Sequence, residues 1–407
     1  MTPNPSNAPT LPRGFRATGV AAGIKKNGAL DLAIIASERD CVAAALFTTN
    51  KVQAAPVLRG KSILASPKSS LRAVVINSGC ANACTGERGL ADAEETARLA
   101  AEAIRQAQSI EGAGTISGSQ VFTMSTGVIG VPLPMDKLRD GIPLAARQLS
   151  VAGLENAARA IMTTDTQPKA AHVQRGAWGI TGIAKGAGMI HPNMATLLCC
   201  VFTDAGVNQA LLKECLQRAA SVSFNRIVID GDTSTNDTLL AMANGASDMQ
   251  IETPGQRAAF EQALTDVCVS LAQQVVRDGE GVTKFITLRV TGARDARMAD
   301  AVGRSIARSP LVKTAFYGED ANWGRVIAAA GYSGEDVDPS RMTLWFGPVK
   351  VFEAGTPTGY DEAEATGAMK PSDIEVRLDL GLGNAEATLW TCDLSHEYVT
   401  INGRYRT

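Results

Sequence analysis

The segment from residue 185 to residue 202 constrains the fold of this chain more than any other part of the sequence. It begins with a lysine and a glycine-rich loop, KGAGMIHPNMA, and continues through Thr196 into the apolar run LLCCVF. The loop glycines permit backbone conformations that other residues resist, whereas the apolar run predicts a buried strand. Thr196 therefore stands where a flexible loop enters the core. Taken alone, a β-branched residue in this place indicates only the start of a strand.

Length and charge exclude several classes of protein. The chain has 407 residues, enough for two or three domains, and a formal net charge of −2 without a basic cluster. We therefore expect neither nucleic-acid nor membrane-surface binding. No apolar run approaches the roughly 18 residues that span a bilayer. The first 15 residues are rich in Pro and Asn and lack the features of a targeting signal, so we expect a cytoplasmic protein.

The cysteines and histidines argue against disulfides and metals. Of the eight cysteines, Cys199 and Cys200 are adjacent within the predicted buried strand, which is typical of reduced, packed thiols. The three histidines have no Cys or His partners at zinc-ligand spacing. We therefore expect no metal site.

The first 284 residues alternate predicted strands and helices. Short apolar segments at 32–36, 42–47 and 73–76 indicate strands of a buried sheet. The motif NSGCAN (77–82) indicates a loop before a helix. Capping residues and helical spacing predict helices that begin near Asp92, near Gly153, after Asn208 and before Phe260.

The pattern changes after residue 284. Apolar and polar residues then alternate in segments around 286–290, 342–346, 374–380 and 387–391. Such alternation predicts an antiparallel, half-exposed sheet, broken by helices near 297–308 and 322–330. The stretch 355–372 shows no clear periodicity, and Tyr398, Val399 and Ile401 suggest a final strand. We therefore predict two domains, 1–284 and 285–407.

Two polar motifs each permit two interpretations. In STGVIG (125–130), Thr126 and Gly127 could direct backbone N–H groups at an oxyanion, although any tight turn would use the same residues. The motif TTDT (163–166) follows a predicted helix. Its hydroxyl groups could serve as capping and turn groups or contact a ligand.

Acidic residues mark two further loops. Asp230, Asp232 and Asp237 lie in DGDTSTND, where a cation site is conceivable, but their spacing misses the EF-hand pattern and favours a hydrogen-bonded loop. Glu280 follows Gly279, a natural C-cap residue for the preceding helix. A carboxylate beyond the negative end of the helix dipole gains nothing from it. We therefore expect Glu280 to face either solvent or a specific cationic partner.

Familiar catalytic motifs are absent from the sequence. It contains no P-loop, no complete dinucleotide fingerprint and no G-x-S-x-G nucleophile elbow. A threonine nucleophile activated by its own α-amine remains compatible with the chain. It would require cleavage of the peptide bond between Ala195 and Thr196. The residues alone leave this interpretation and that of an ordinary strand start both open.

Over nearly its whole length the chain resembles the ornithine acetyltransferase family, also called the bifunctional arginine-biosynthesis glutamate N-acetyltransferases. The segment KGAGMIHPNMATLL (185–198) resembles the self-cleavage and nucleophile segment of that family. The supporting motifs are STGVIG (125–130), MTTDT (162–166), DGDTSTND (230–237), DGEG (278–281), GEDANWG (318–324) and NGRYRT (402–407). One departure is Cys80, where Asn would be expected, and it concerns local packing rather than chemistry.

The resemblance implies an α/β fold: a layered α-β-β-α sandwich like that of N-terminal-nucleophile enzymes, with a smaller antiparallel α+β C-terminal domain. It implies self-cleavage into chains 1–195 and 196–407, assembled as an α2β2 heterotetramer. The implied reaction transfers acetyl from N-acetylornithine to glutamate through an acetyl-Thr196 intermediate, without metal or organic cofactor. Acetyl-CoA use as a second donor is left open.

The resemblance also implies residue roles. Thr196 would be the nucleophile, while Thr126 and Gly127 would form the oxyanion hole. The implied substrate contacts are Thr163 (chosen over Thr164), Lys185, Thr196, Glu280, Asn402 and Thr407. Two alternatives stay open: an N-terminal-nucleophile aminopeptidase or amidase that uses water as acceptor, and an uncut metabolite-binding protein.

Overall fold

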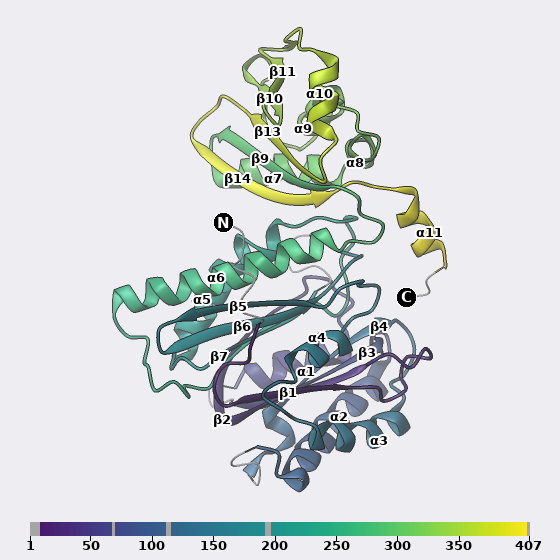
Figure 1. Ribbon diagram of the computed structural model, residues 1–407, viewed down its shortest axis with the longest axis vertical. Coiled ribbons are helices and arrows are strands. Elements are labelled where there is room, and N and C mark those ends of the chain that lie inside the picture. The colour runs from purple at the N-terminus through teal and green to yellow at the C-terminus, as the bar shows by residue number, and fades with distance from the viewer. Residues whose placement is uncertain (1–8, 67–69, 111–114, 192–196, 405–407) are drawn as a thin grey trace.

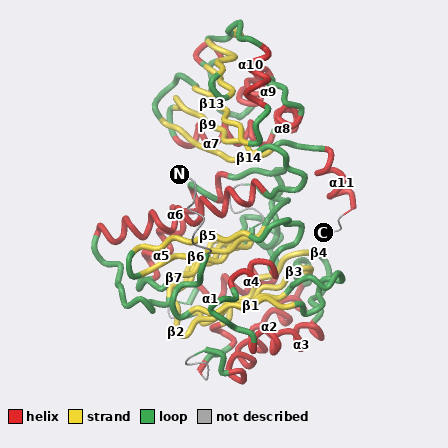
Figure 2. The backbone as a smooth tube through the Cα atoms, in the orientation of Figure 1, coloured by secondary structure: helices red, strands yellow, loops and turns green. Residues whose placement is uncertain are grey.

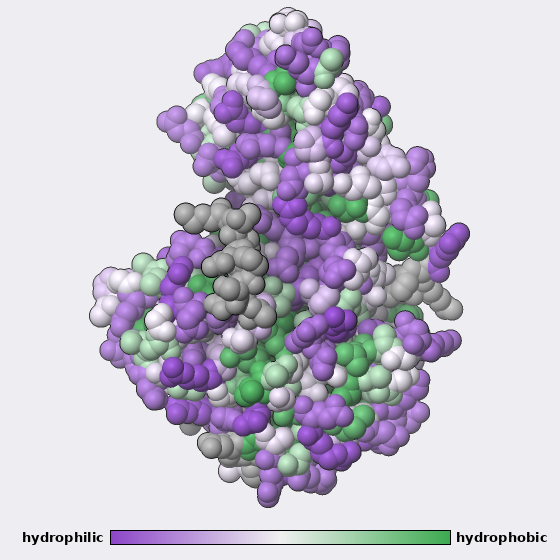
Figure 3. Space-filling model, viewed as in Figure 1, coloured by the Kyte–Doolittle hydropathy of each residue, from purple (hydrophilic) through white to green (hydrophobic). Residues whose placement is uncertain are grey.

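The computed structural model describes residues 9–66, 70–110, 115–191 and 197–404. Two sheets organise the molecule, a large one in the lower part of Figure 1 and a smaller one above it. Figure 2 shows that helices flank both sheets. In Figure 3, hydrophilic residues cover most of the face in view, and apolar residues gather in small groups over the larger part. Within the described residues, no helix has the length and apolar character needed to cross a membrane.

One long, bent strand divides the large sheet into two layers. This strand, β2 (Leu32–Phe47), pairs through its first half with β1 (Phe15–Val20) and β3 (Leu71–Cys80). Its second half pairs with β8 (Thr238–Ala243). The predicted separate strands at 32–36 and 42–47 are therefore one strand, with a register shift and exposed polar residues at the bend.

The two layers pack face to face and carry helices on their outer surfaces. The strand order is β4-β3-β2-β8-β7-β6-β5, with β1 paired to β2. The remaining strands are β4 (Val121–Val128), β5 (Lys169–Arg175), β6 (Trp178–Lys185) and β7 (Leu198–Thr203). The helices are α1 (Ala55–Leu64), α2 (Gly86–Ala107), α3 (Met135–Arg147), α4 (Leu154–Ala160), α5 (Gln209–Ser221) and α6 (Pro254–Arg277). Helices α2 and α3 cover one layer, α5 and α6 cover the other, and a third core fills the space between the layers. The predicted α-β-β-α sandwich is confirmed.

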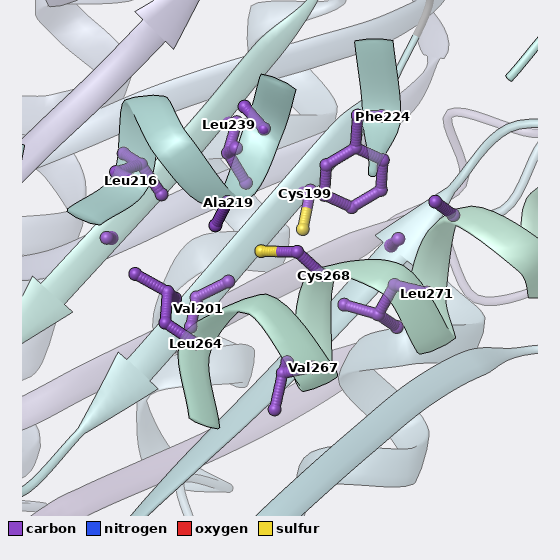
Figure 4. Packing of buried hydrophobic residues seen from close by; sticks show 14 of the residues in the cluster. Cys199, Val201, Leu216, Ala219, Phe224, Leu239, Leu264, Val267, Cys268 and Leu271 are labelled. Atoms are coloured by element: carbon purple, nitrogen blue, oxygen red, sulfur yellow. The ribbon is translucent and has the colours of Figure 1, made fainter. Parts of the chain in front are cut away.

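The predicted central strand is β7, in the middle of the layer formed by β8, β7, β6 and β5. All six residues of β7 are buried, and β7 pairs with β6 on one side and β8 on the other. Figure 4 shows Cys199 of β7 and Cys268 of α6 pointing toward each other among aliphatic side chains. Both cysteines are free and fully buried. All six residues of the run LLCCVF are therefore buried, as predicted.

Helix boundaries follow the predicted caps in some places and not in others. The side chain of Asn208 accepts a hydrogen bond from the Leu211 N–H (2.9 Å) and caps α5, as predicted. Helix α2, however, begins at Gly86 rather than near Asp92, and its N-cap Thr85 makes no side-chain capping hydrogen bond. The motif at 77–82 is not simply a loop, since β3 continues to Cys80 beside β4.

The smaller sheet is built from residues after 284. Its order is β12-β11-β10-β13-β9-β14. The strands are β9 (Phe285–Ala293), β10 (Thr343–Phe346), β11 (Val349–Glu353), β12 (Thr356–Pro357), β13 (Asp373–Asp379) and β14 (Ala385–Cys392). Helices α7 (Ala296–Arg308), α8 (Pro310–Tyr317), α9 (Trp323–Gly331) and α10 (Glu362–Met369) accompany it. Its apolar core, to which Val228 also belongs, supports our proposal of a second domain at 285–407.

Three predictions for this part need correction. The sheet is not purely antiparallel: β9 and β13 are parallel, and the chain between them passes through α7–α10. The stretch 355–372 contains α10, whose N-cap Asp361 accepts two backbone hydrogen bonds. The expected final strand is instead helix α11 (His396–Arg404). Its apolar residues do not enter a sheet, and none of its residues is buried.

Candidate active site

A pocket lies where the ends of β4 and β6 meet the starts of β7 and β8. It encloses about 120 Å³. Its described lining residues are Ala81, Thr126, Gly127, Ile129, Thr163, Thr164, Lys185, Gly188, Met189, Asp230, Asp232, Ser234, Thr235, Asn236, Glu280, Tyr398 and Asn402. Segments distant in the sequence therefore converge on one cavity.

The pocket brings together most of the predicted site residues. These are Thr126, Gly127, Thr163, Lys185, Glu280 and Asn402. Thr164 also lines the cavity, so the choice between Thr163 and Thr164 stays a prediction. Ala195, Thr196 and Thr407 lie outside the described residues. Leu197, which follows Thr196 in the chain, is held at the start of β7 by a hydrogen bond from its N–H to Asp237 Oδ1 (2.8 Å).

Thr126 and Gly127 lie near the C-terminal end of β4, beside β3. Gly127 has φ +127°, and a Cβ atom there would lie 2.4 Å from the carbonyl carbon of Gly79. Only glycine fits this close approach of two backbones. The Thr126 hydroxyl lies 3.5 Å from Lys185 Nζ. The predicted oxyanion element therefore stands beside the pocket's buried ammonium group.

Lys185 is a buried cation at the end of β6. Its residue is 4% exposed, and within the described part of the chain no carboxylate forms an ion pair with its Nζ. Burial lowers the pKa of Lys185, while the charge of Asp165 opposes that shift. A buried ammonium without a carboxylate partner is suited to binding a carboxylate of a ligand.

Asp165 organises the inner wall of the pocket, a role that the sequence did not reveal. Its side chain accepts hydrogen bonds from the Thr163 N–H (2.9 Å), the Gly186 N–H (2.7 Å) and Lys169 Nζ (2.6 Å). Burial alone would raise the pKa of Asp165, but Lys185 and Lys169 hold it at about 2. The carboxylate therefore fixes Thr163 and the backbone after Lys185 in one arrangement.

Lys169 connects this wall to the DGEG motif. Its Nζ also contacts Asp278 Oδ2 at 2.5 Å, and Asp278 accepts a hydrogen bond from the Thr166 N–H (3.0 Å). Asp278 is the C-cap of α6, so the prediction that Gly279 takes this position is wrong. The sequence pointed to the hydroxyl groups of TTDT as capping or ligand-binding groups. In the structure, Asp165 of TTDT and Asp278 of DGEG make most of the hydrogen bonds that hold this wall together.

Glu280 faces neither a close cation nor open solvent. It is 9% exposed, and its Oε2 accepts a hydrogen bond from Asn402 Nδ2 (2.6 Å). A Cβ atom on Gly188 would lie 2.4 Å from that same oxygen, so any residue other than glycine at position 188 would clash with the Glu280 side chain. Among the described side chains, none forms the ion pair with Glu280 that the sequence led us to expect. An incoming ammonium group would meet a carboxylate that is already positioned.

The C-terminal helix α11 forms the mouth of the pocket. Tyr398 donates its hydroxyl hydrogen to Asp230 Oδ2 (3.2 Å), and Ser395 donates to the Gly281 carbonyl (2.6 Å). Asp230 Oδ1 also accepts from the Ile190 N–H (2.9 Å). These contacts support the hydrogen-bonded loop interpretation of residues 230–237. They also explain how the tail reaches the site although its predicted conformation was wrong.

Comparison with known proteins identifies the family. The family model described as "ArgJ family" matches residues 16–407. The chain is 50% identical to the "Arginine biosynthesis bifunctional protein ArgJ" of Symbiobacterium thermophilum over 408 residues, with 98% of each chain covered. The chain belongs to the ArgJ family. The resemblance seen in the sequence is thus confirmed.

Other members of the ArgJ family match over similar lengths. The Geobacter sulfurreducens protein of the same name is 50% identical over 402 residues, covering 97% of this chain and 99% of its own. A solved structure described as ornithine acetyltransferase complexed with ornithine, from Mycobacterium tuberculosis, is 43% identical. It covers 47% of this chain and 96% of its own, with a TM-score of 0.42. As a member of the ArgJ family, this chain is an acetyltransferase of arginine biosynthesis.

Proposed function

We propose that this ArgJ-family enzyme transfers acetyl from N2-acetyl-L-ornithine to L-glutamate, in the cyclic route of arginine biosynthesis. The observation that supports this most is the convergence of Thr126, Gly127, Lys185 and Glu280 on one pocket beside the start of β7. That arrangement combines oxyanion donors, a buried cation and a buried carboxylate. N2-acetyl-L-ornithine presents the complementary groups: an amide carbonyl, the α-carboxylate and the δ-ammonium.

In the proposed mechanism, the bond between Ala195 and Thr196 is first cleaved by the chain itself, giving chains 1–195 and 196–407. The α-amine of Thr196 then takes the proton of its own hydroxyl, whose oxygen attacks the acetyl carbonyl. Thr126 and Gly127 stabilise the resulting oxyanion; losing one such donor typically costs about 3–4 kcal/mol of transition-state stabilisation. Ornithine leaves with the proton, and glutamate removes the acetyl group from Thr196 in the second half of the cycle.

The binding roles follow from charge and position. Lys185 pairs with a substrate carboxylate, because it is buried and has no ion pair among the described residues. Glu280 binds a substrate amino group, while Asn402 holds Glu280 from the mouth of the pocket. Thr163 contacts the substrate from the wall that Asp165 fixes. Thr196 and Thr407 complete the proposed contacts, and the proposed reaction uses neither a metal nor an organic cofactor.

Incubation of the purified enzyme with N-acetylornithine, with and without glutamate, tests the reaction. Glutamate-dependent release of ornithine is expected. Glutamate-independent release would instead indicate the amidase alternative, in which water accepts the acetyl group.

On a denaturing gel we expect two bands near half mass for the wild type. For Thr196→Ala we expect a single full-length band and no transfer; a cut, active Thr196→Ala enzyme would refute the assigned nucleophile.

A second activity is favoured by the names of the relatives, which describe them as bifunctional. We propose that acetyl-CoA also acylates Thr196, so that the enzyme makes N-acetylglutamate directly. An assay with acetyl-CoA and glutamate alone tests this. Formation of N-acetylglutamate is expected, and its absence in an enzyme that still uses N-acetylornithine would restrict the chain to one activity.

We further propose an α2β2 assembly, which the family resemblance implies, and a cytoplasmic location. Light scattering of the purified protein is expected to give twice the 42.5 kDa of one chain. A mass equal to one chain would refute the assembly.

A further inference from the structure

Asn236 lines the pocket, but both hydrogens of its side-chain amide are already used. The residue is 6% exposed and lies just before β8. Its Nδ2 donates to the carbonyl oxygens of Ala81 (2.6 Å) and Ser125 (2.8 Å), and an amide nitrogen carries only two hydrogens. Its Oδ1 accepts a hydrogen bond from the Thr235 hydroxyl (2.6 Å). Asn236 therefore acts on the backbone around the pocket.

The first of these two acceptors, the Ser125 carbonyl, orients the start of the proposed oxyanion element. This carbonyl and the Thr126 N–H belong to one peptide unit, which is planar and trans. A hydrogen bond that fixes the carbonyl oxygen therefore also fixes the direction in which the Thr126 N–H points. The Ser125 hydroxyl donates to Asn77 Oδ1 (2.6 Å), so the same residue is held through its side chain as well.

The second acceptor, the Ala81 carbonyl, braces the far side of the same element. The Ala81 N–H donates to the carbonyl of Val128 (2.9 Å), the residue that follows Gly127. Asn236 is thus connected directly to the residue before Thr126 and, through Ala81, to the residue after Gly127. The two proposed oxyanion donors lie between these two points of attachment.

The loop that carries Asn236 is fixed by contacts that do not involve its side chain. The Thr48 hydroxyl donates to the Ser234 carbonyl (2.7 Å), and the Ala54 N–H donates to the Thr235 carbonyl (2.9 Å). Truncation of the Asn236 side chain therefore leaves these contacts of the loop in place and removes the two hydrogen bonds to the neighbouring backbone.

Building on the proposed function, we infer that Asn236 is a positioning residue for the oxyanion element Thr126–Gly127. It holds that element where the negative charge develops on the acetyl oxygen. Donors that are already aligned need no reorganisation during the reaction. A tetrahedral intermediate forms both when Thr196 is acylated and when glutamate removes the acetyl group. Loss of Asn236 therefore slows both halves of the cycle.

Asn244 provides a matched control at the other end of β8. It is also 6% exposed, and its Nδ2 likewise makes two hydrogen bonds, to the Arg13 carbonyl (3.0 Å) and to Ser37 Oγ (3.2 Å). It is not among the described residues that line the pocket. Asn244→Ala therefore removes an equivalent buried amide without touching the oxyanion element.

The first test separates catalysis from binding in the cut enzymes. Because a displacement of about 1 Å in a catalytic group costs up to roughly a hundredfold in rate, we expect kcat to fall by about tenfold to a hundredfold in Asn236→Ala. Asn236→Asp, which keeps the size of the side chain but not its donor, should show the same loss. Rapid-quench assays should show acetylation and deacetylation slowed alike. The Kd of ornithine, measured by calorimetry, should stay at the wild-type value, and Asn244→Ala should keep the wild-type kcat.

A double-mutant cycle with Thr126→Ala provides the second test. If Asn236 acts through the oxyanion element, the loss of kcat in the double variant should fall short of the product of the single losses by about threefold or more. Independent, multiplicative losses would overturn the inference.

Three other results would overturn it as well. These are a wild-type kcat in both Asn236 variants, an equal loss of kcat in Asn244→Ala, and a folded chain that stays uncut in both Asn236 variants. Failure of the proposed function would appear separately. A wild type without glutamate-dependent transfer would refute the reaction, and a Thr126→Ala enzyme with unchanged kcat would refute the oxyanion assignment on which the inference rests.

Discussion

The inner wall and the mouth of the pocket are held in different ways. At the inner wall, Asp165 and Lys169 are buried and share several short hydrogen bonds with two loops. At the mouth, α11 has no buried residues and is tied to the body through contacts such as Tyr398 with Asp230 and Asn402 with Glu280. The contrast indicates that changes to the inner wall should affect folding, whereas changes to the mouth should affect binding.

The largest expected effect on stability is that of Asp165→Asn. This change leaves Lys169 and Lys185 buried without their shared carboxylate. Breaking a buried ion pair typically costs about 3–5 kcal/mol, and we expect the free energy of unfolding to drop by that amount in urea titrations. The exposed pair of Arg159 with Glu155 supplies the control, since Glu155→Gln should cost less than about 1 kcal/mol. Equal losses of unfolding free energy in the two variants would show that the buried pair at the inner wall stabilises the fold no more than an exposed surface pair.

Lys185→Met should impair catalysis more than any change at the mouth. A buried charged partner is worth about 2–5 kcal/mol in binding, which corresponds to a fall in kcat/KM for N-acetylornithine of roughly 30-fold to several thousandfold. Steady-state assays measure it. Within the same pocket, Asn402→Ala should weaken transfer less, because it removes only a contact to Glu280. Lys185→Met instead removes the cation that is predicted to bind the substrate carboxylate. A Lys185→Met enzyme with unchanged kcat/KM would refute the assigned role.

The inner wall also predicts an acid limit to stability. The pKa of Asp165 is lowered from 3.8 to about 2, so its stabilising contribution is fully present above about pH 4 and is lost as the pH falls toward 2. The wild type should therefore lose stability across this window, and Asp165→Asn should lose less. Unfolding titrations at a series of pH values check the slope. Parallel slopes in the two proteins would contradict the assignment.

Tyr398→Phe is the mildest of these changes. It removes one hydrogen bond to Asp230, worth about 1 kcal/mol, from a helix without buried residues. We expect KM to rise by about fivefold, with the melting temperature close to that of the wild type. A large loss of stability with unchanged KM would show that the mouth is part of the folding core.

The sequence predicted the parts of the fold that depend on local pattern. The buried run at 197–202, the Asn208 cap and the long helix around 260–275 all form as expected. Predictions failed where distant contacts decide the outcome. The alternation at 374–380 does not reveal that β13 lies parallel to β9. The apolar residues of the tail resemble a strand, yet residues 396–404 form a helix that contacts Asp230 through Tyr398 and Glu280 through Asn402.

The site residues divide in the same way, into those that a local motif identifies and those that depend on contacts between distant segments. Family motifs located the lining of the pocket, including Lys185 and Glu280. They did not show that Asp165 joins Thr163 to the backbone after Lys185, or that Asp237 holds the Leu197 N–H. Such contacts join segments that are far apart in the sequence. The local pattern of residues therefore does not reveal them before the fold is known.

Acylation of Thr196 is the central claim, and intact-mass spectrometry tests it most directly. The cut enzyme is incubated with N-acetylornithine in the absence of glutamate and then quenched in acid. We predict that chain 196–407 gains the mass of one acetyl group, mapped to its first residue, and that added glutamate removes it. Glutamate-dependent transfer without any acetylated Thr196 would contradict the account.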